Sequence, residues 1–361
     1  MAVLSFISGL ALLILGAEVL VRGASKIAAG LGISPLIIGL TVVAFGTSSP
    51  ELAVSIKAAV SNQADIALGN VVGSNIFNVL FILGISALIV PLRVSQQLIR
   101  LDVPLMIGVS ALTFILAFDL NISRIDGILL ILSLVGYVGF LIYQSLGNSE
   151  KDPDSDLTDA GKDEHSEKSG WLFNLMLVVG GLGLLVIGSR WFVNSAVSFA
   201  NYLGISELVI GLTIIAAGTS MPEVVTSIIA AIRGERDIAI GNVVGSNIFN
   251  IMGVLGFASV LAPAGIGVSE AFVSFDIPLM IAVAIACLPI FFTKGTISKW
   301  EGALFLSYYI VYTLYLILAG TDHETLPVVN NIMLYFVIPL TVLTILVIAI
   351  QELRIKSESA N

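Results

Sequence analysis

Charged residues are scarce in this chain of 361 residues, because only 11% are Asp, Glu, Lys or Arg while 57% are hydrophobic. A soluble domain carries roughly a quarter charged residues, so this scarcity excludes an ordinary soluble globule. Alternating segments of about ten residues, which a transmembrane barrel needs, are also absent. The chain instead holds repeated apolar runs long enough to cross a bilayer core of about 30 Å. The sequence therefore predicts an all-α polytopic membrane protein.

Cysteine and histidine are nearly absent. The single cysteine, Cys287, lies in an apolar run, which excludes an intramolecular disulfide and a cysteine-based metal cluster. The two histidines, His165 and His323, lie in polar connectors, so a histidine metal site or catalytic triad is not expected within the bilayer. No nucleophile–base pair is apparent either. We therefore predict that the protein is not an enzyme and uses no cofactor.

A segment of forty residues occurs twice. Residues 39–78 align with residues 211–250 without a gap, at a constant offset of 172, and 26 of the 40 positions are identical. The sequence LDVPLM at 101–106 also recurs as FDIPLM at 275–280. Self-similarity of this length indicates that the protein is built from two copies of one unit.

Eleven apolar segments are predicted to span the membrane, with five before an acidic linker and six after it. They cover residues 3–21, 34–60, 66–91, 101–118, 126–146, 171–189, 206–232, 238–262, 273–293, 300–319 and 328–350. Because each repeat holds five spans, an odd number, the second repeat enters the membrane from the opposite side, which gives inverted repeats. The predicted parts are a first inverted repeat at 1–146, an acidic cytoplasmic linker at 147–170, a second inverted repeat at 171–320, and an extra transmembrane helix with a cytoplasmic tail at 321–361.

The basic residues predict the orientation. With the N-terminus outside, 13 lysines and arginines fall on the inner side, and only Lys57, Arg124 and Arg190 fall on the outer side. This distribution follows the positive-inside rule. The apolar N-terminus lacks a basic region before it, so we interpret it as a first span rather than a signal peptide. We expect a multi-pass protein of the cell (inner) membrane, with the N-terminus outside and the linker and C-terminus in the cytoplasm.

Each repeat carries one glutamate inside an apolar helix that a proline interrupts. The motif is GTSSPE at 46–51 and GTSMPE at 218–223. Proline removes an amide donor and clashes with the carbonyl four residues earlier, and such a break in lipid is tolerated only beside protein, water or an ion. The polar side chains of each motif are three and four residues apart and share one helix face: Thr47, Ser48 and Glu51, and Thr219, Ser220 and Glu223.

A second duplicated motif, GNVVGSNIFN at 69–78 and 241–250, supplies further oxygens. Its glycines, four apart, allow close approach of another helix. The side chains that share a face are Ser74 and Asn78 in one copy, and Ser246 and Asn250 in the other. Hydroxyl, amide and carboxylate oxygens suit hard cations such as Na⁺ and Ca²⁺.

The two glutamates need neutralisation. An unpaired charge at mid-membrane costs at least ~2.5–3.5 kcal/mol on insertion scales, and no Lys or Arg lies near Glu51 or Glu223 in the sequence. One Ca²⁺ ion discharges both carboxylates, and so do two monovalent ions, which is a physical basis for exchange at one site. The simpler alternative is that both glutamates are protonated structural groups. The recurrence of the proline break and the hydroxyls around each glutamate favours the cation site.

Other acidic residues have structural interpretations. Asp65 and Asp237 each open a helix and are predicted to be N-caps. Asp102 and Asp276, each two residues before a proline, are predicted to start helices rather than to bind ions. Glu18 aligns with Arg190, so it breaks the symmetry and is expected near a membrane edge.

Asn75 and Asn247 lie within the second motif, beside the predicted ligands. Adjacent positions point in different directions around a helix, so packing or bonding between helices is favoured for this pair over ion binding.

The motifs GTSSPE and GTSMPE and the doubled GNVVGSNIFN resemble those of the cation/calcium antiporter superfamily, in particular its prokaryotic sodium/calcium exchanger branch. The resemblance covers residues 1–320 and implies two inverted five-helix halves whose second and third helices build a central cluster of ion sites. It implies that Glu51 and Glu223 are the carboxylates that bridge Ca²⁺ and Na⁺. The remaining oxygens would come from side chains or nearby backbone of Thr47, Ser48, Ser74, Thr219, Ser220 and Ser246, from the carbonyls of Ala44 and Ala216, and from Asn78 and Asn250.

The resemblance implies a secondary transporter that exchanges Na⁺ for Ca²⁺ by electrogenic alternating access. Potassium-dependent members carry an acidic residue at the position of Asn250, so the neutral asparagine in both repeats favours exchange without K⁺. The alternatives are a Ca²⁺/H⁺ antiporter, since protons also discharge carboxylates, and a passive cation channel. The expected partners are Ca²⁺ and Na⁺ as substrates and the lipid bilayer, with no nucleic acid.

Overall fold

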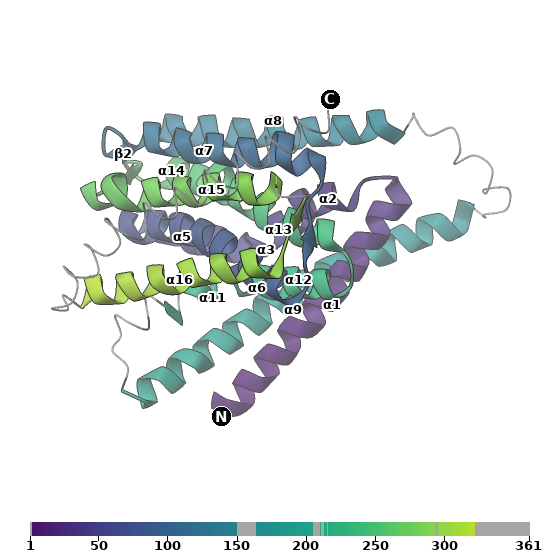
Figure 1. Cartoon of the computed structure of the whole chain (residues 1–361), viewed down its shortest axis with the longest axis horizontal. Coiled ribbons are helices and arrows are strands. Elements are labelled where there is room, and N and C mark those ends of the chain that lie inside the picture. Colours follow the sequence, from purple (N-terminus) through teal and green to yellow (C-terminus); the bar gives the residue numbers. More distant parts are fainter. Residues whose placement is uncertain are drawn as a thin grey trace.

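The computed structural model describes residues 2–149, 164–204, 210, 213–214, 216–292 and 295–321. These residues form a bundle of roughly side-by-side helices (Figure 1). In the described ranges, eight helices are long and apolar enough to cross a membrane, and a further candidate span is bent by 45° between Pro35–Thr47 and Ser49–Val60. The predicted all-α membrane fold is therefore confirmed. The predicted eleventh span at 328–350 lies outside the described residues.

The first repeat begins with the longest of its helices, α1, and ends with α8. Its helices are α1 (Ala2–Leu31), α2 (Pro35–Ile38), α3 (Ala44–Thr47), α4 (Ser49–Val60), α5 (Ala64–Phe77), α6 (Gly84–Ile89), α7 (Val103–Leu116) and α8 (Arg124–Ser149). The π-helical turns η1 (Gly39–Val43), η2 (Asn78–Leu83) and η3 (Leu98–Asp102) join some of them, and the short strands are β1 (Leu92–Arg93) and β2 (Asn121–Ile122).

The second repeat has corresponding elements. Its helices are α9 (Glu164–Tyr202), α11 (Ala216–Gly218), α12 (Met221–Ile232), α13 (Arg236–Phe249), α14 (Gly256–Leu261), α15 (Ile277–Phe292) and α16 (Lys299–Gly320). Its π-helical turns are η6 (Asn250–Leu255) and η7 (Phe272–Asp276), and its strands are β3 (Ile266–Gly267) and β4 (Thr296–Ile297). The turn η6 follows η2 at the same offset of 172 residues that relates the duplicated motifs.

Two short antiparallel strand pairs reflect the symmetry between the repeats. Strand β1 pairs with β4, and β2 pairs with β3, so each ladder takes one strand from each repeat. The predicted topology places the two connectors of each ladder on the same side of the membrane. The final helix of each repeat also starts with the same device, because Ser123 pairs with Asp126 at the start of α8 and Ser298 with Glu301 at the start of α16.

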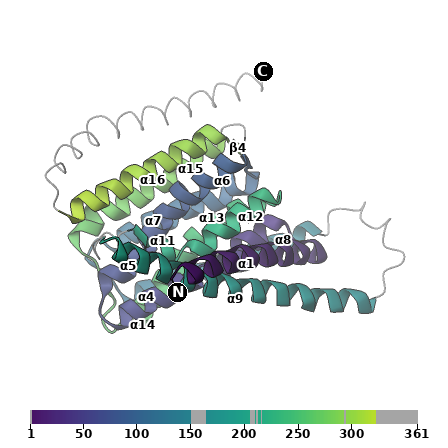
Figure 2. The same ribbon diagram turned by 90° about the horizontal axis from the view of Figure 1, so that it is seen from below.

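The helices α1 and α9 pack against each other, and in Figure 2 they lie along the opposite edge of the bundle from α16. Glycines make their close approach possible. A Cβ atom on Gly16 would lie 2.9 Å from the carbonyl oxygen of Gly181, and one on Gly181 would lie 2.8 Å from that of Gly16. Gly9 and Gly188 meet in the same reciprocal way. Any larger side chain here would collide with backbone.

One predicted boundary was wrong. The first span does not end at residue 21, because α1 continues to Leu31. Arg22 and Lys26 suggested a connector, but both point away from the protein while Ala24 and Ala28 continue the buried face. At the predicted linker, 147–170, α8 extends to Ser149 and α9 starts at Glu164, so both helices continue beyond the candidate membrane spans Arg124–Ser145 and Gly170–Tyr202.

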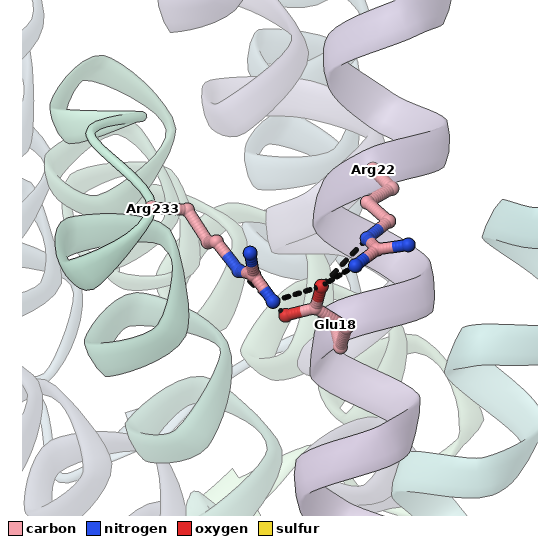
Figure 3. Close-up of polar contacts among 3 residues, drawn as sticks. All are labelled: Glu18, Arg22 and Arg233. Carbon is pink, nitrogen blue, oxygen red and sulfur yellow. Dashed lines mark hydrogen bonds and ion pairs between the residues drawn. The ribbon is translucent and has the colours of Figure 1, made fainter.

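Glu18 connects α1 to the end of α12. Its carboxylate, with 18% of the side chain exposed, pairs with Arg22 on the same helix and with Arg233 directly after α12 (Figure 3). Seven residues further along α1, the Ser25 hydroxyl donates to Glu235 at 2.6 Å. These polar contacts join the first helix of one repeat to the second repeat.

The N-cap predictions for Asp65 and Asp237 were wrong. Each lies one residue inside its helix, after the caps Gln63 and Glu235, and contributes its charge to the first turn. The helix-start prediction for Asp102 was also wrong, because the helical span runs from Leu98 to Leu116 and Asp102 lies inside it, at the end of η3. The Tyr137 hydroxyl of α8 donates to Asp102 at 2.9 Å, and Asp102 is fully buried.

Candidate cation-binding site

The helix breaks lie where the two proline motifs predicted them. Thr47 ends α3, Ser48 leaves the helical conformation with φ −78° and ψ 5°, and α4 starts at Ser49. In the second repeat Ser220, with φ −85° and ψ 9°, precedes α12 in the same way. Each proline therefore occupies the first turn of the following helix, where the missing N–H costs no internal bond. Glu51 and Glu223 lie one residue later.

Each of the two glutamates accepts a hydrogen bond from a serine of the other repeat. The Ser220 hydroxyl donates to Oε1 of Glu51 at 2.9 Å, and the Ser48 hydroxyl donates to Oε1 of Glu223 at 3.2 Å. Ser220 also lies 3.3 Å from the hydroxyl of Ser74. The break of each repeat thus contacts the carboxylate of the other, and both motifs form one site.

Both carboxylates are buried without a counter-charge from the described residues. Glu51 is 1% exposed and Glu223 is fully buried. The second oxygen, Oε2, of each has no hydrogen-bond partner, and the described ion pairs all involve Glu18 rather than either residue. A buried charge left unpaired is costly, so the two free oxygens mark a place for a cation or a proton.

Four asparagines form the centre of the molecule. Asn78 donates to the side-chain oxygen of Asn247 at 3.0 Å, and Asn250 donates to that of Asn75 at 3.1 Å. Asn75 and Asn247 also donate to each other's backbone carbonyls, each at 3.3 Å. The predicted bonding of this pair between helices is therefore confirmed. The Oδ1 atoms of Asn78 and Asn250 are buried and unpartnered, which leaves two more acceptor oxygens.

The other predicted ligands lie in the same region with different partners. Ser246 is fully buried and its hydroxyl has no partner. The carbonyl of Ala44 accepts the Ser48 amide at 3.0 Å and the Thr47 hydroxyl at 3.3 Å, so it is occupied. Ala216 starts α11, at the position equivalent to Ala44.

Two functional candidates escaped the sequence analysis, namely Asn70 and Asn242. Asn242 accepts the Thr47 hydroxyl at 3.0 Å, and Asn70 accepts the Thr219 hydroxyl at 3.3 Å. They are the first asparagines of the doubled GNVVGSNIFN motif. Their repetition at the offset of 172 was the available signal, but only the structure places them beside the helix breaks.

The donor set is oxygen-rich and low in charge. Within the part of the chain that the structure describes, no three or more His, Cys, Asp or Glu side chains gather as a metal cluster. Two carboxylates with neutral hydroxyl and amide oxygens, placed between inverted repeats at broken helices, are the kind of oxygen set that suits a hard cation in a transporter. Fold and site together define a secondary transporter of small cations.

A family model described as "Sodium/calcium exchanger protein" matches residues 1–143 and 173–318. The chain therefore belongs to the sodium/calcium exchanger family. It is a multi-pass membrane protein and a cation/calcium antiporter, not an enzyme, and the family transports Ca²⁺ and Na⁺.

Relatives align over most of the chain. A protein named CaxA, from Alkalimonas amylolytica, is 41% identical over 84% of this chain and 95% of its own length. Inner membrane protein YrbG of Escherichia coli is 39% identical over 78% of this chain and 86% of its own length. Sodium/calcium exchanger MaX1 of Methanosarcina acetivorans is 35% identical, covering 84% and 95%.

A solved structure of the sodium-calcium exchanger NCX_Mj superposes with a TM-score of 0.73 at 30% sequence identity. The match covers 86% of this chain and 97% of NCX_Mj. The inverted-repeat fold predicted from the helix count is therefore confirmed.

Proposed function

We propose that the protein exchanges Na⁺ for Ca²⁺ across the membrane by alternating access at one site between the broken helices. The observation that carries this proposal is the pair Glu51 and Glu223, each with one oxygen bonded across the repeats and one buried oxygen free. One Ca²⁺ between them neutralises both charges. Sodium ions achieve the same neutralisation, so the two cargoes compete for one set of oxygens.

The proposed ligands surround these carboxylates. They comprise the side chains of Glu51, Glu223, Ser48, Ser220, Ser74, Ser246, Thr47, Thr219, Asn78 and Asn250 and the backbone carbonyls of Ala44 and Ala216. Five oxygens of this set are available without breaking a bond, namely Oε2 of Glu51 and Glu223, the Ser246 hydroxyl, and Oδ1 of Asn78 and Asn250. A cation at the Ala44 carbonyl has to displace the Thr47 hydroxyl from it.

Sodium is favoured over protons as the counter-ion because the site holds more neutral oxygens than proton binding requires. A proton binds one carboxylate oxygen, whereas Na⁺ and Ca²⁺ need several oxygens each. Ca²⁺/H⁺ exchange is the second candidate function, since the free Oε2 atoms of Glu51 and Glu223 also accept protons. A passive channel is disfavoured by the burial of both glutamates, which leaves no open pathway at this site.

We further propose that the protein lies in the inner membrane of the cell. Its N-terminus faces outward, and its linker and C-terminus face the cytoplasm. The name of the relative YrbG agrees with the inner membrane. In this orientation Thr47 lies towards the cytoplasm and Thr219 towards the outside. Thr47 is buried and Thr219 is half-buried, so the threonine on the proposed outer side is the more exposed of the two.

The test is calcium uptake into proteoliposomes that contain purified protein. Sodium-loaded vesicles diluted into sodium-free medium are expected to accumulate Ca²⁺, and Glu51→Gln and Glu223→Gln are expected to abolish the uptake. A pH gradient that drives uptake without Na⁺ would establish proton exchange instead. Calcium flux that needs no counter-ion would establish a channel.

Two further arms address charge and potassium. Net charge movement during exchange is expected to make the rate respond to a membrane potential imposed with an ionophore. Because Asn78 and Asn250 are neutral, adding or removing K⁺ on either side is expected to leave the rate unchanged once the membrane potential is clamped. A strict requirement for K⁺ would reject this part of the proposal.

A further inference from the structure

Asn70 on α5 and Asn242 on α13 hold equivalent places in the two repeats, 172 residues apart. Each follows the glutamate of its own repeat by 19 residues. Asn242 is fully buried and Asn70 is half-buried. Neither residue belongs to the proposed ligands, yet both contact the two helix breaks.

Asn242 joins three segments through one amide group. Its Nδ2 donates to the backbone carbonyl of Glu223 at 3.4 Å and to the Ser227 hydroxyl at 2.9 Å, and its Oδ1 accepts the Thr47 hydroxyl. The carbonyl of Glu223 can only accept, so the amide must present nitrogen to it and oxygen to Thr47. The orientation of the amide group is therefore fixed by its surroundings.

Asn70 repeats this arrangement with the repeats reversed. Its Nδ2 donates to the backbone carbonyl of Glu51 at 3.1 Å and to the Ser55 hydroxyl at 2.8 Å, while its Oδ1 accepts from Thr219. Each asparagine thus connects the residue at the break of one repeat to the glutamate-bearing turn of the other. Two such connections therefore join the broken helices of the two repeats.

The side-chain amide atoms of Asn70 and Asn242 already have hydrogen-bond partners within the protein. Both hydrogens of each Nδ2 have an acceptor, and each Oδ1 already accepts a threonine hydroxyl. An asparagine in this state offers little to an ion, but it fixes where Thr47 and Glu223, or Thr219 and Glu51, lie relative to each other. Calcium sites depend on such spacing, because selectivity between cations follows from cavity size and ligand rigidity.

We propose that Asn70 and Asn242 are positioning residues that hold the two broken helices at the spacing required for calcium binding. The proposal rests on the proposed function in placing the cation at Glu51 and Glu223. It adds that the site is held together by two amides that do not touch the cation. The two connections differ in burial, because Asn242 is fully buried and Asn70 is half-buried, and in the threonine contact, which is 3.0 Å long at Asn242 and 3.3 Å at Asn70.

The test uses Asn242→Leu and Asn70→Leu, which keep the approximate size of the side chain and remove all three bonds. Ser259→Ala is the matched control, because Ser259 is fully buried and bonds only within its own helix, to the Leu255 carbonyl. Calcium binding to purified protein is measured by calorimetry, and uptake kinetics are measured in vesicles. We expect either asparagine variant to weaken Ca²⁺ binding by roughly three- to tenfold, the size of one hydrogen-bond contribution, because the lost bonds position the site and do not touch the cation.

The expected change is a higher KM for Ca²⁺ with little change in the maximal rate, and a melting temperature close to that of the control variant. Wild-type calcium affinity in a folded Asn70→Leu protein would overturn the proposal. Asn70→Leu is the informative variant if Asn242→Leu fails to fold, since Asn70 lies at the half-buried end.

A double-mutant cycle tests the connection itself. If Asn242 acts through Thr47, the effects of Thr47→Val and Asn242→Leu on calcium affinity are less than additive. Full additivity would show that the two residues act separately and would overturn the proposal. Calcium affinity is measured without a counter-ion and therefore does not depend on exchange. If the asparagine variants bind Ca²⁺ more weakly but the wild-type protein shows no sodium-driven uptake, the proposed exchange is rejected and this inference stands.

Discussion

The Ser220 hydroxyl lies 2.9 Å from Oε1 of Glu51, closer than the equivalent contact from Ser48 to Glu223 at 3.2 Å. Ser220 also contacts Ser74, whereas the residue equivalent to Ser74, Ser246, has an unpartnered hydroxyl. The two halves of the site are therefore related in sequence but differ in their hydrogen bonds. The half that contains Glu51 is more completely bonded.

This difference predicts unequal effects of serine removal. Ser220→Ala removes the donor to Glu51 and the contact with Ser74, so we expect it to reduce calcium affinity more than Ser48→Ala does. A hydrogen bond to a charged group contributes about 1.5–3 kcal/mol, which sets the upper range for Ser220→Ala. Sodium-driven uptake over a calcium concentration series measures both variants. Equal losses would contradict the structural asymmetry.

Asn250→Asp is expected to make exchange depend on pH. The amide of Asn250 donates to Oδ1 of Asn75 at 3.1 Å, and an ionised aspartate would place two acceptors against each other. When protonated, the carboxyl group donates instead and the contact is restored. The variant should therefore approach wild-type activity as the pH falls and lose activity as the pH rises. The unsatisfied pair of acceptors costs about 1–3 kcal/mol of free energy.

The measurement is the ratio of Asn250→Asp to wild-type uptake across a pH series, because the wild-type protein corrects for protonation elsewhere. Asn78→Asp provides a second variant, since Asn78 donates to Asn247 in the equivalent way. A ratio that is constant with pH would contradict the prediction.

Gly181→Ala is expected to destabilise the contact between α1 and α9. A Cβ atom at Gly181 would lie 2.7 Å from the backbone nitrogen of Leu20, which cannot move without shifting α1. Overpacking of this kind costs about 1–3 kcal/mol, and a lower melting temperature in detergent should report it. Gly183→Ala is the control, because that glycine is exposed and a methyl group added there would have no other atom within 4 Å. Equal stability of the two variants would show that α1 and α9 do not approach as closely as described.

Glu18→Gln is expected to weaken the connection between α1 and the end of α12. Arg22 and Arg233 are 61% and 52% exposed, so each pair contributes at most about 1 kcal/mol and is screened by salt. The loss in melting temperature should therefore shrink as the salt concentration rises. The exchanged pair Glu18→Arg with Arg233→Glu should recover part of the loss, and failure to do so would indicate that Glu18 acts in another way.

Much of the fold followed from the sequence because helix breaks, apolar length and internal duplication are local or periodic signals. Pro50 and Pro222 identified both breaks, and an odd number of spans in each repeat identified the inversion. The end of α1 was less predictable. Arg22 and Lys26 have the composition of a connector, and only the buried Ala24 and Ala28 reveal that the helix continues.

The site was predictable to the extent that its residues share a helix face. Spacing grouped Ser48 with Glu51 and Ser220 with Glu223, but it did not show that each serine bonds the glutamate of the other repeat. The roles of Asn70 and Asn242 were missed for the same reason. Their partners Thr219 and Thr47 are far away in the chain, and spacing within one helix contains no information about such contacts.

The ion pair of Glu18 with Arg233 has a consequence for the resting state of the transporter. At the equivalent positions of the other half stand Arg190 and Ser61, which cannot form an ion pair with each other. If the two halves were identical, the inward-facing and outward-facing forms of the proposed cycle would have equal free energy. If the pair forms in only one of the two forms, that form gains an electrostatic contribution that its counterpart lacks, and residues that diverged between the repeats then bias the occupancy of the two forms. In this proposal the shared motifs select the ions, and the differences between the halves bias the side of the membrane to which the empty carrier opens.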